Sequence, residues 1–395
     1  MSRKQVFKPL LFSLILLLSG FHSTSGQVAD TTVYLITCGP GTDTYSIYGH
    51  SALRVVIINN KTDTVYNWGV FDFSTPNFAW KFAKGRLEYM LYAGSYERFL
   101  RGYFYEKRFV WLQKVNLNPK ETERMVSLIK ENLKPENIKY RYDFFYDDCS
   151  TRIRDLFENS IGEKLEYPSD PETDPPTFRE LITNYQRQFH WLQFGIDLLL
   201  GSPVDIDAYL RDRMFLPIEM QIGLSEATID RSGERIPLLQ KPEVIFDFEA
   251  PQLNQKFIYS PIFLFTLFLI SVIIFSLLFK GRRVNGLIDI MIYFIFSVLA
   301  VIMIFFNFFT DHQQLRWNYN IVWLNPLLIL CLGAIVFNRK AKLLFRLVFF
   351  ITGAFLLLHF FLPQSFNFVF YPLVLIILVR SFARAGFKWN PFSIY

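Results

Sequence analysis

The chain has 395 residues, of which 51% are hydrophobic and 18% aromatic, and its formal net charge at pH 7 is +6. The charge is uneven, because residues 28–256 hold 27 Lys and Arg against 33 Asp and Glu, whereas the apolar residues 257–395 hold 11 basic residues and two acidic ones. The positive balance therefore gives no support for nucleic-acid binding, and the apolar C-terminal part excludes a wholly water-soluble protein.

The N-terminus has the pattern of a secretory signal peptide. Arg3, Lys4 and Lys8 precede the apolar residues 10–18, and small polar residues follow at 23–26. This order predicts cleavage near Gly26 or Gln27 and export of the residues that follow.

The first exported segment predicts a β-hairpin with a histidine at its base. Residues 32–37 read as a buried strand and residues 38–44 as a glycine-rich turn, after which His50 precedes the β-branched run 52–58. Residues 65–70 are expected to pair with that run across the turn at residues 59–61. Asn67 would then be placed to orient the imidazole of a catalytic His50, with Asp72 as the alternative orienting group. A purely structural role for His50 is the other interpretation.

Residues 77–105 are rich in aromatic side chains, among them Phe78, Trp80, Phe82 and Tyr89. We expect amphipathic helices packed on a core here, and the alternative is a groove for acyl chains or a face that rests on lipid. A strand at residues 108–115 and a helix at residues 122–132, started by Asn118 and Pro119, are predicted next.

Cys149 stands where a helix is expected to begin, because apolar residues recur at helical spacing through residues 152–161. A thiol at that position faces unpaired N–H groups and the positive end of the helix dipole, both of which favour the thiolate. We therefore predict that Cys149 is a nucleophile and that His50 is its base. The carboxylate of Asp148 would raise the pKa of the thiol unless Arg152 or Arg154 compensates.

The chain has three cysteines, so few arrangements are open. A Cys38–Cys149 disulfide is the alternative to a free nucleophile, because both residues would lie in an oxidising compartment. Cys331 is expected to pack inside a membrane helix. No CxxC or HxxxH spacing occurs, so we predict neither a metal site nor another cofactor.

Past Cys149, the patterns are weaker. A helix is predicted to begin at residues 177–180, and another is predicted at residues 205–220. An extended tether is predicted at residues 236–250. We interpret His190 as a histidine of the core. We divide the chain into a signal peptide (1–26), a catalytic core (28–160), a helical and loop extension (161–256) and a transmembrane domain (257–395).

The last domain contains five apolar segments, at residues 257–279, 287–306, 321–337, 343–361 and 366–379. The first four approach the length of about 17–25 residues that a membrane helix requires. The connections at residues 280–283, 339–342 and 380–388 are basic and therefore cytoplasmic, which places the preceding domain outside the cytoplasm. His359 is expected to pack within the fourth segment.

The exported loop at residues 307–320 is polar and carries Asp311, His312, Arg316, Trp317 and Asn318. It is either an interfacial cap that anchors helix ends or a segment that docks on the catalytic domain and helps to hold a lipid head group.

Five separated blocks carry a resemblance that covers about residues 33–157 and 307–327: YSIYGHSALRV, VYNWGVFDFS, FAKGRLEYML, YDDCSTRIRDL and NFFTDHQQLRWNYNIVWLNPL. They resemble the bacterial Lnb family of lipoprotein N-acyltransferases. The order of elements also looks like the circularly permuted papain-like proteins, which include lecithin:retinol acyltransferase and are related to NlpC/P60 domains. One departure is that the family usually has Asn where Asp148 stands.

The resemblance implies an α+β exported domain of permuted papain-like fold, followed by a five-helix transmembrane bundle in the cell inner membrane with the catalytic domain in the periplasm. It implies Cys149 as nucleophile, His50 as base and Asn67 as orienting group. Residues near these blocks are expected to bind substrate, namely Tyr48, Arg54, Asp72, Arg152, Asp311, His312 and Asn318. The implied substrates are lipoproteins and phospholipid, with no cofactor and no nucleic acid. A membrane-bound phospholipase, a cysteine peptidase and a non-catalytic envelope scaffold are the alternative functions.

Overall fold

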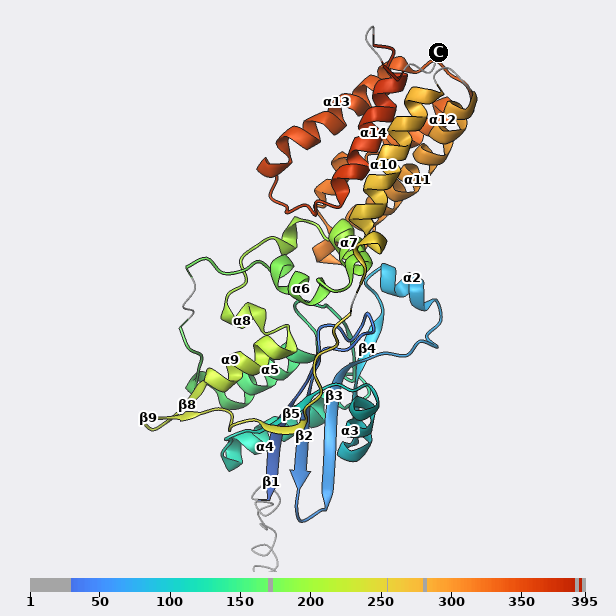
Figure 1. Cartoon of the computed structure of the whole chain (residues 1–395). Coiled ribbons are helices and arrows are strands. Elements are labelled where there is room, and N and C mark those ends of the chain that lie inside the picture. Colours follow the sequence, from blue (N-terminus) through green and yellow to red (C-terminus); the bar gives the residue numbers. More distant parts are fainter. Residues whose placement is uncertain (1–29, 170–172, 254, 280–282, 388–390, 393–395) are drawn as a thin grey trace, which may run out of the picture.

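The computed structural model describes residues 30–169, 173–253, 255–279, 283–387 and 391–392. The expected signal peptide lies outside these residues. The described chain has a sheet-rich domain followed by a helical domain, and the two meet end to end (Figure 1).

A seven-stranded sheet organises the first domain, with every neighbouring pair of strands antiparallel. In spatial order its strands are β10 (Glu243–Phe246), β5 (Val110–Lys114), β1 (Thr31–Cys38), β2 (His50–Ile57), β3 (Thr62–Val70), β4 (Glu88–Ser95) and β6 (Lys139–Arg141). The expected hairpin of β2 and β3 is present, and His50 is the first residue of β2.

The two faces of the sheet have different partners because strand side chains alternate between faces. Leu35 and Leu53 belong to a core shared with helices α4 (Pro119–Asn132), α5 (Cys149–Ile161) and α9 (Pro217–Glu226). Ile36 and Ala52 belong to a second core, against which α3 (Tyr96–Tyr105) packs. The sheet is therefore covered on both sides, and α5 presents its start to one end of β2 and β3.

Local capping fixes where α4 and α5 begin. The side chain of Asn118 accepts from the backbone N–H of Glu121, and the carboxylate of Glu121 accepts in return from Asn118. Asp148 and Thr151 form the equivalent capping box at α5. These reciprocal bonds satisfy N–H groups that a helix start leaves free, so Cys149 opens a helix as predicted.

Three sequence expectations need correction. The aromatic region is not purely helical, because β4 lies between the short helix α2 (Phe78–Ala83) and α3 and pairs with both β3 and β6. Residues 205–220 do not form one helix but contribute to α8 (Leu210–Arg213) and α9, because Pro217 has no N–H to continue a preceding helix. The tether after residue 236 is not only a linker, since β10 completes one edge of the main sheet.

Smaller elements fill the space between the sheet and the helical domain. They are α6 (Phe178–Gln186), which begins after Thr177 as expected, and α7 (His190–Leu199). A second sheet joins β7 (Leu165–Glu166), β8 (Thr228–Arg231) and β9 (Glu234–Pro237).

The helical domain consists of α10 (Pro261–Leu278), α11 (Arg283–Phe308), α12 (Leu327–Val336), α13 (Lys342–Leu358) and α14 (Phe370–Arg384). Among the described residues, three helices are long and apolar enough to cross a membrane, or four if the bent pair 313–322 and 327–336 counts as one span. These helices support a membrane protein, while five membrane crossings stay a prediction, because α14 has only 15 residues.

A buried ion pair holds part of the bundle together. The guanidinium of Arg380 on α14 lies 2.5 Å from the carboxylate of Asp289 on α11, and both side chains are fully buried. Ser276 on α10 also accepts from Arg380. The expected basic connection at residues 380–388 thus begins inside α14, where a buried charge is costly unless it is paired, and these contacts supply the pairing.

The domains are joined by hydrogen bonds between loops. The amide of Asn318, in the loop between α11 and α12, donates to the carbonyls of Leu198 and Leu199 at 2.8 and 2.9 Å. Arg179 on α6 binds Asp205 at 2.8 Å, and the backbone N–H of Ser365 donates to the same carboxylate. The connection of β2 to β3 lies far from the bundle in Figure 1, so the ends of these strands that carry His50 and Asn67 face the membrane domain.

Candidate active site

Cys149 lies where β2 and β3 separate. The register between these strands ends at the pair Leu53–Tyr66, so Ser51 has no partner on β3. Oγ of Ser150 lies 3.8 Å from the sulfur of Cys149. The hydroxyl of Ser150 also donates to that of Ser51 at 3.3 Å. The start of α5 is thereby tied to the residue that follows His50.

His50 and Asn67 form the second part of the site. Nε2 of His50 lies 2.6 Å from Oδ1 of Asn67. Because an amide oxygen only accepts, Nε2 carries the proton and Nδ1 is left as the basic nitrogen. Burial lowers the pKa of His50 to about 4, although the bond to Asn67 opposes this shift. The imidazole is therefore neutral near pH 7 and can accept a proton.

The described contacts bring His50 to Asn67 and bring Ser150, the residue after Cys149, to Ser51. In the part of the chain that the structure describes, no hydrogen bond joins the sulfur of Cys149 directly to the imidazole of His50. Hydrogen bonds of catalytic groups are often long without substrate and tighten only in the reacting complex.

The electrostatics of Cys149 favour a thiol that needs a base. Burial raises the pKa of Cys149 above its ordinary value, and neighbouring hydrogen-bond donors oppose this shift. Burial disfavours the charged form, whereas donors to the thiolate stabilise it. All three cysteines are free in the structure, which therefore contains no Cys38–Cys149 disulfide.

Asp148 caps α5 and has no cationic partner among the described contacts. Its Oδ1 accepts from the N–H groups of Ser150 and Thr151, at 3.0 and 2.8 Å. Burial raises the pKa of Asp148 well above its ordinary value, and the neighbouring Cys149 adds to this effect.

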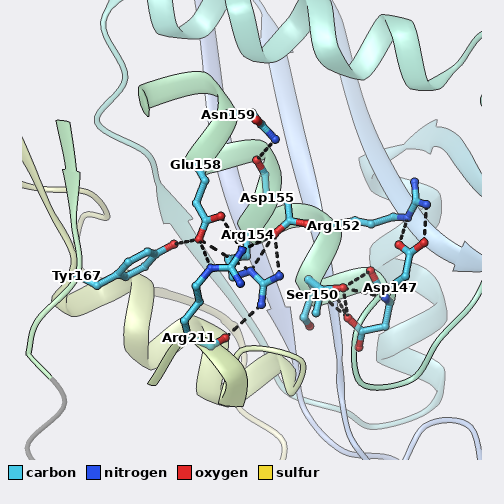
Figure 2. A network of polar contacts seen from close by, with 11 residues as sticks. Asp147, Ser150, Arg152, Arg154, Asp155, Glu158, Asn159, Tyr167 and Arg211 are labelled. Carbon is cyan, nitrogen blue, oxygen red and sulfur yellow. Dashed lines mark hydrogen bonds and ion pairs between the residues drawn. The ribbon is translucent and has the colours of Figure 1, made fainter. Parts of the chain in front are cut away.

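Neither Arg152 nor Arg154 compensates the carboxyl of Asp148. Arg152 makes two hydrogen bonds to the carboxylate of Asp147, at 2.5 and 2.9 Å, and Arg154 binds Asp155, as Figure 2 shows. A bidentate carboxylate fixes a guanidinium in one direction, so neither cation is directed at Asp148.

Two family models match the chain. Residues 22–184 match the Lnb N-terminal periplasmic domain, and residues 252–388 match the Lnb transmembrane domain. This chain belongs to the Lnb family. A search of curated proteins and a search of solved structures each found no match. The family and the apolar helices together describe a membrane protein with an extracytoplasmic domain, and the family suggests a function related to lipoprotein N-acylation.

Several residues expected to bind substrate in this Lnb protein already contact other side chains. The hydroxyl of Tyr48 accepts from the amide of Gln186 at 2.7 Å. Arg54 makes two 2.7 Å bonds to Asp63 on the side of the sheet that α3 covers. Asp72 is exposed and bonds to Ser74, so Asn67 rather than Asp72 contacts His50.

The Lnb loop at residues 307–320 docks on the sheet-rich domain. Asp311 pairs with Arg86 at 2.7 Å, and Nε2 of His312 lies 2.8 Å from the carbonyl of Phe82. Asn318 is buried at the junction, and its side-chain amide donates to the carbonyls of the last two residues of α7. Of the two interpretations of this loop, docking is what the structure shows, and a role in binding a head group stays a prediction.

Sequence reasoning missed a contact between this loop and the segment before Cys149. The side-chain amide of Gln314 donates to both carboxylate oxygens of Asp143, each at 2.8 Å. Asp143 also accepts from the backbone N–H groups of Phe145 and Tyr146. The only indication of this contact in the sequence was the polarity of the loop at residues 307–320, and that polarity does not predict which residue binds Gln314.

Gly69 on β3 was also missed. Its φ of 85° lies in the region that favours glycine, and a Cβ there would lie 3.7 Å from Cε2 of Tyr142 and 3.9 Å from Cβ of Cys149. The absent side chain leaves space between the Tyr142 ring and the start of α5. The glycine pattern within VYNWGV was the available signal.

A pocket of about 190 Å³ lies beside Asn67 on the α3 side and is also lined by Tyr92 and Arg98. A larger pocket, of about 640 Å³, lies between residues 202–206 and 359–366 at the domain junction. Among the described residues, no group of three His, Cys, Asp or Glu side chains could hold a metal ion.

Proposed function

We propose that this protein is a lipoprotein N-acyltransferase that moves a fatty acyl chain through a thioester on Cys149. One observation carries the proposal. A buried thiol stands at a helix start that Ser150 joins to Ser51, the residue after a neutral histidine whose imidazole is oriented by Asn67. Thiol, neutral imidazole and orienting amide are the parts that nucleophilic acyl transfer uses.

In the first half of the reaction, Nδ1 of His50 accepts the thiol proton as the sulfur of Cys149 attacks the carbonyl carbon of a fatty ester. The carbonyl oxygen becomes an oxyanion, for which the backbone N–H of Cys149, at the first position of α5, is the candidate donor. The tetrahedral intermediate then expels the alcohol oxygen, which takes the proton from His50, and a thioester remains.

In the second half, the α-amine of the N-terminal cysteine of a lipoprotein attacks the thioester carbon. His50 accepts the proton that the amine loses and returns it to the departing sulfur. The products are an amide and the free thiol. We place this reaction at the outer face of the cell inner membrane, with phospholipid or the lipoprotein's own ester as donor, in a domain of permuted papain-like fold.

Trapping of the acyl group on Cys149 tests the proposal. The full-length protein in vesicles is incubated with a phospholipid carrying a labelled acyl chain and without a lipoprotein, and its peptides are examined by mass spectrometry. We expect label on Cys149 in the wild type and in Cys38→Ser, and none in Cys149→Ser. Addition of a reporter lipoprotein should then move the label to its N-terminal amine.

Two results would contradict the proposal. Release of the acyl group to water in the presence of the lipoprotein would indicate a phospholipase that uses the same residues. A Cys149→Ser variant that still N-acylates the reporter would exclude the thioester.

A further inference from the structure

A continuous row of aromatic rings connects the surroundings of Cys149 to the surface of the domain. The Tyr142 ring, which adjoins Cys149 across Gly69, stacks on Tyr89 with centroids 4.3 Å apart. Tyr89 contacts Phe71 at 5.1 Å, and Phe71 contacts Phe78 at 5.8 Å. We call these residues, with Phe73 and Phe82 at the outer end, the aromatic row.

The outer end of the aromatic row is exposed and lies beside a membrane helix. Phe73 and Phe82 are 70% and 54% exposed, which is unusual for two large apolar rings that lie close together. Trp80, on the same short helix α2, contacts Phe305 of α11 at 5.5 Å. The ammonium of Lys84 donates to the carbonyl of Phe309 at the end of that helix.

The position of Phe73 and Phe82 beside α11 indicates that lipid covers these exposed rings. α11 is long and apolar enough to span the membrane, and Phe308 and Phe309 at its end are exposed. Figure 1 shows α2 next to the end of the helical bundle that meets the sheet-rich domain. The exposed rings are thus continuous with a lipid-facing surface, where aromatic side chains are favoured.

We propose that the aromatic row binds the fatty acyl chain of the donor ester and leads it from the bilayer to Cys149. The inference rests on the proposed function and names its donor subsite. Phe73 and Phe82 contact the chain where it leaves the bilayer, Phe71 and Tyr89 contact its middle, and Tyr142 contacts the carbons nearest the ester. The space left by Gly69 lies at the inner end of the row, next to the thiol.

Photolabelling tests this binding without the reaction. The full-length Cys149→Ala variant is placed in vesicles of phosphatidylethanolamine, part of which carries a diazirine on one acyl chain, and labelled residues are located by mass spectrometry after irradiation. We expect label on Phe71, Tyr89 or Tyr142, in addition to the membrane helices. Label confined to α10–α14 and the exposed rings of α2 would overturn the proposal, because an annular lipid reaches those positions without a binding site.

Chain-length selectivity supplies the second measurement. The variants Phe71→Ala and Phe73→Ala are compared with Tyr105→Ala, which removes an 80% exposed ring from α3 and serves as the matched control. We expect the ratio of kcat/KM for a hexadecanoyl ester to that for a butanoyl ester to fall about tenfold in the first two variants, because contacts with distal methylene groups are lost. The control should keep the wild-type ratio.

An unchanged ratio in both variants would overturn the role of the aromatic row even if Cys149 is acylated normally. If the wild type forms no thioester with either ester, the proposed function fails, and the photolabelling result still decides whether an acyl chain occupies the row.

Discussion

The side chain of Gln314 in the membrane domain donates to both carboxylate oxygens of Asp143, six residues before Cys149. Asp143 in turn organises the turn that leads to α5, because its backbone pairs in both directions with Asp147 and its Oδ1 accepts from Phe145 and Tyr146. A loop of the membrane domain therefore supports the segment that positions Cys149, the proposed nucleophile.

We predict that Gln314→Ala slows acylation of Cys149 about tenfold, because loss of a hydrogen bond to a charged group costs about 1.5 kcal/mol and loosens the turn at residues 143–147. The rates of thioester formation and of iodoacetamide alkylation of Cys149 measure this. Gln313→Ala, which truncates the exposed neighbouring side chain, is the matched control. Equal rates for both variants and the wild type would exclude a positioning role for Gln314.

The pH dependence of activity should report the buried imidazole. Because burial lowers the pKa of His50 to about 4, the base stays neutral well below pH 6.5, and kcat/KM should fall only near pH 4. Asn67→Asp places a carboxylate against the ring, which favours imidazolium and should move the acid limb toward neutral pH. A wild-type midpoint near 6.5, or an acid limb that does not move in Asn67→Asp, would contradict this assignment of the base.

Stability should change over the same range. His50 binds a proton more readily in the unfolded chain, where its pKa is about 6.5, than in the folded protein. The free energy of unfolding should therefore fall as the pH drops from about 6.5 toward 4. His50→Gln, which cannot titrate, should show a weaker decline in urea titrations of the detergent-solubilised protein at a series of pH values.

Asp148→Asn should keep both stability and activity. Burial disfavours a charge at this position, and an amide oxygen can accept the same bonds from Ser150 and Thr151. Asp148→Ala removes the cap and should cost about 1 kcal/mol, measured as a lower Tm. A large loss of acylation in Asp148→Asn alone would mean that the carboxylate charge has a role in the reaction.

Gly69→Ala should lower the rate of acylation of Cys149 by more than the loss of stability alone accounts for. The new methyl group would lie within 4 Å of both Tyr142 and Cys149 and would fill the space next to the thiol. Gly233→Ala is the matched control, because its φ of 95° imposes similar backbone strain and a Cβ there meets nothing within 4 Å. If both variants lose stability alike and neither loses acylation, the space beside Gly69 has no role in the reaction.

The sequence by itself determined the features that depend on near neighbours. The start of α5 at Cys149 follows from a capping box within four residues, and the position of His50 at the start of β2 follows from a short hairpin pattern. Asn67 could be named because the hairpin brings it to the same end as His50. The apolar segments of the membrane domain were visible from length and composition alone.

Only the tertiary structure decided the contacts that join distant segments. Gln314 and Asp143 are 171 residues apart, and the hydroxyl of Ser150 meets that of Ser51, 99 residues earlier, beyond the point where the pairing of β2 with β3 ends. The guanidinium of Arg154 also donates to the carbonyl of Arg211, 57 residues further along the chain, at 3.1 Å. The physical reason is distance along the chain. The hydrogen bonds of a helix cap or a hairpin join residues that are close in sequence, so a local pattern predicts them. A polar side chain that could bond to any of several similar acceptors elsewhere in the chain meets one of them only when the strands and domains pack together.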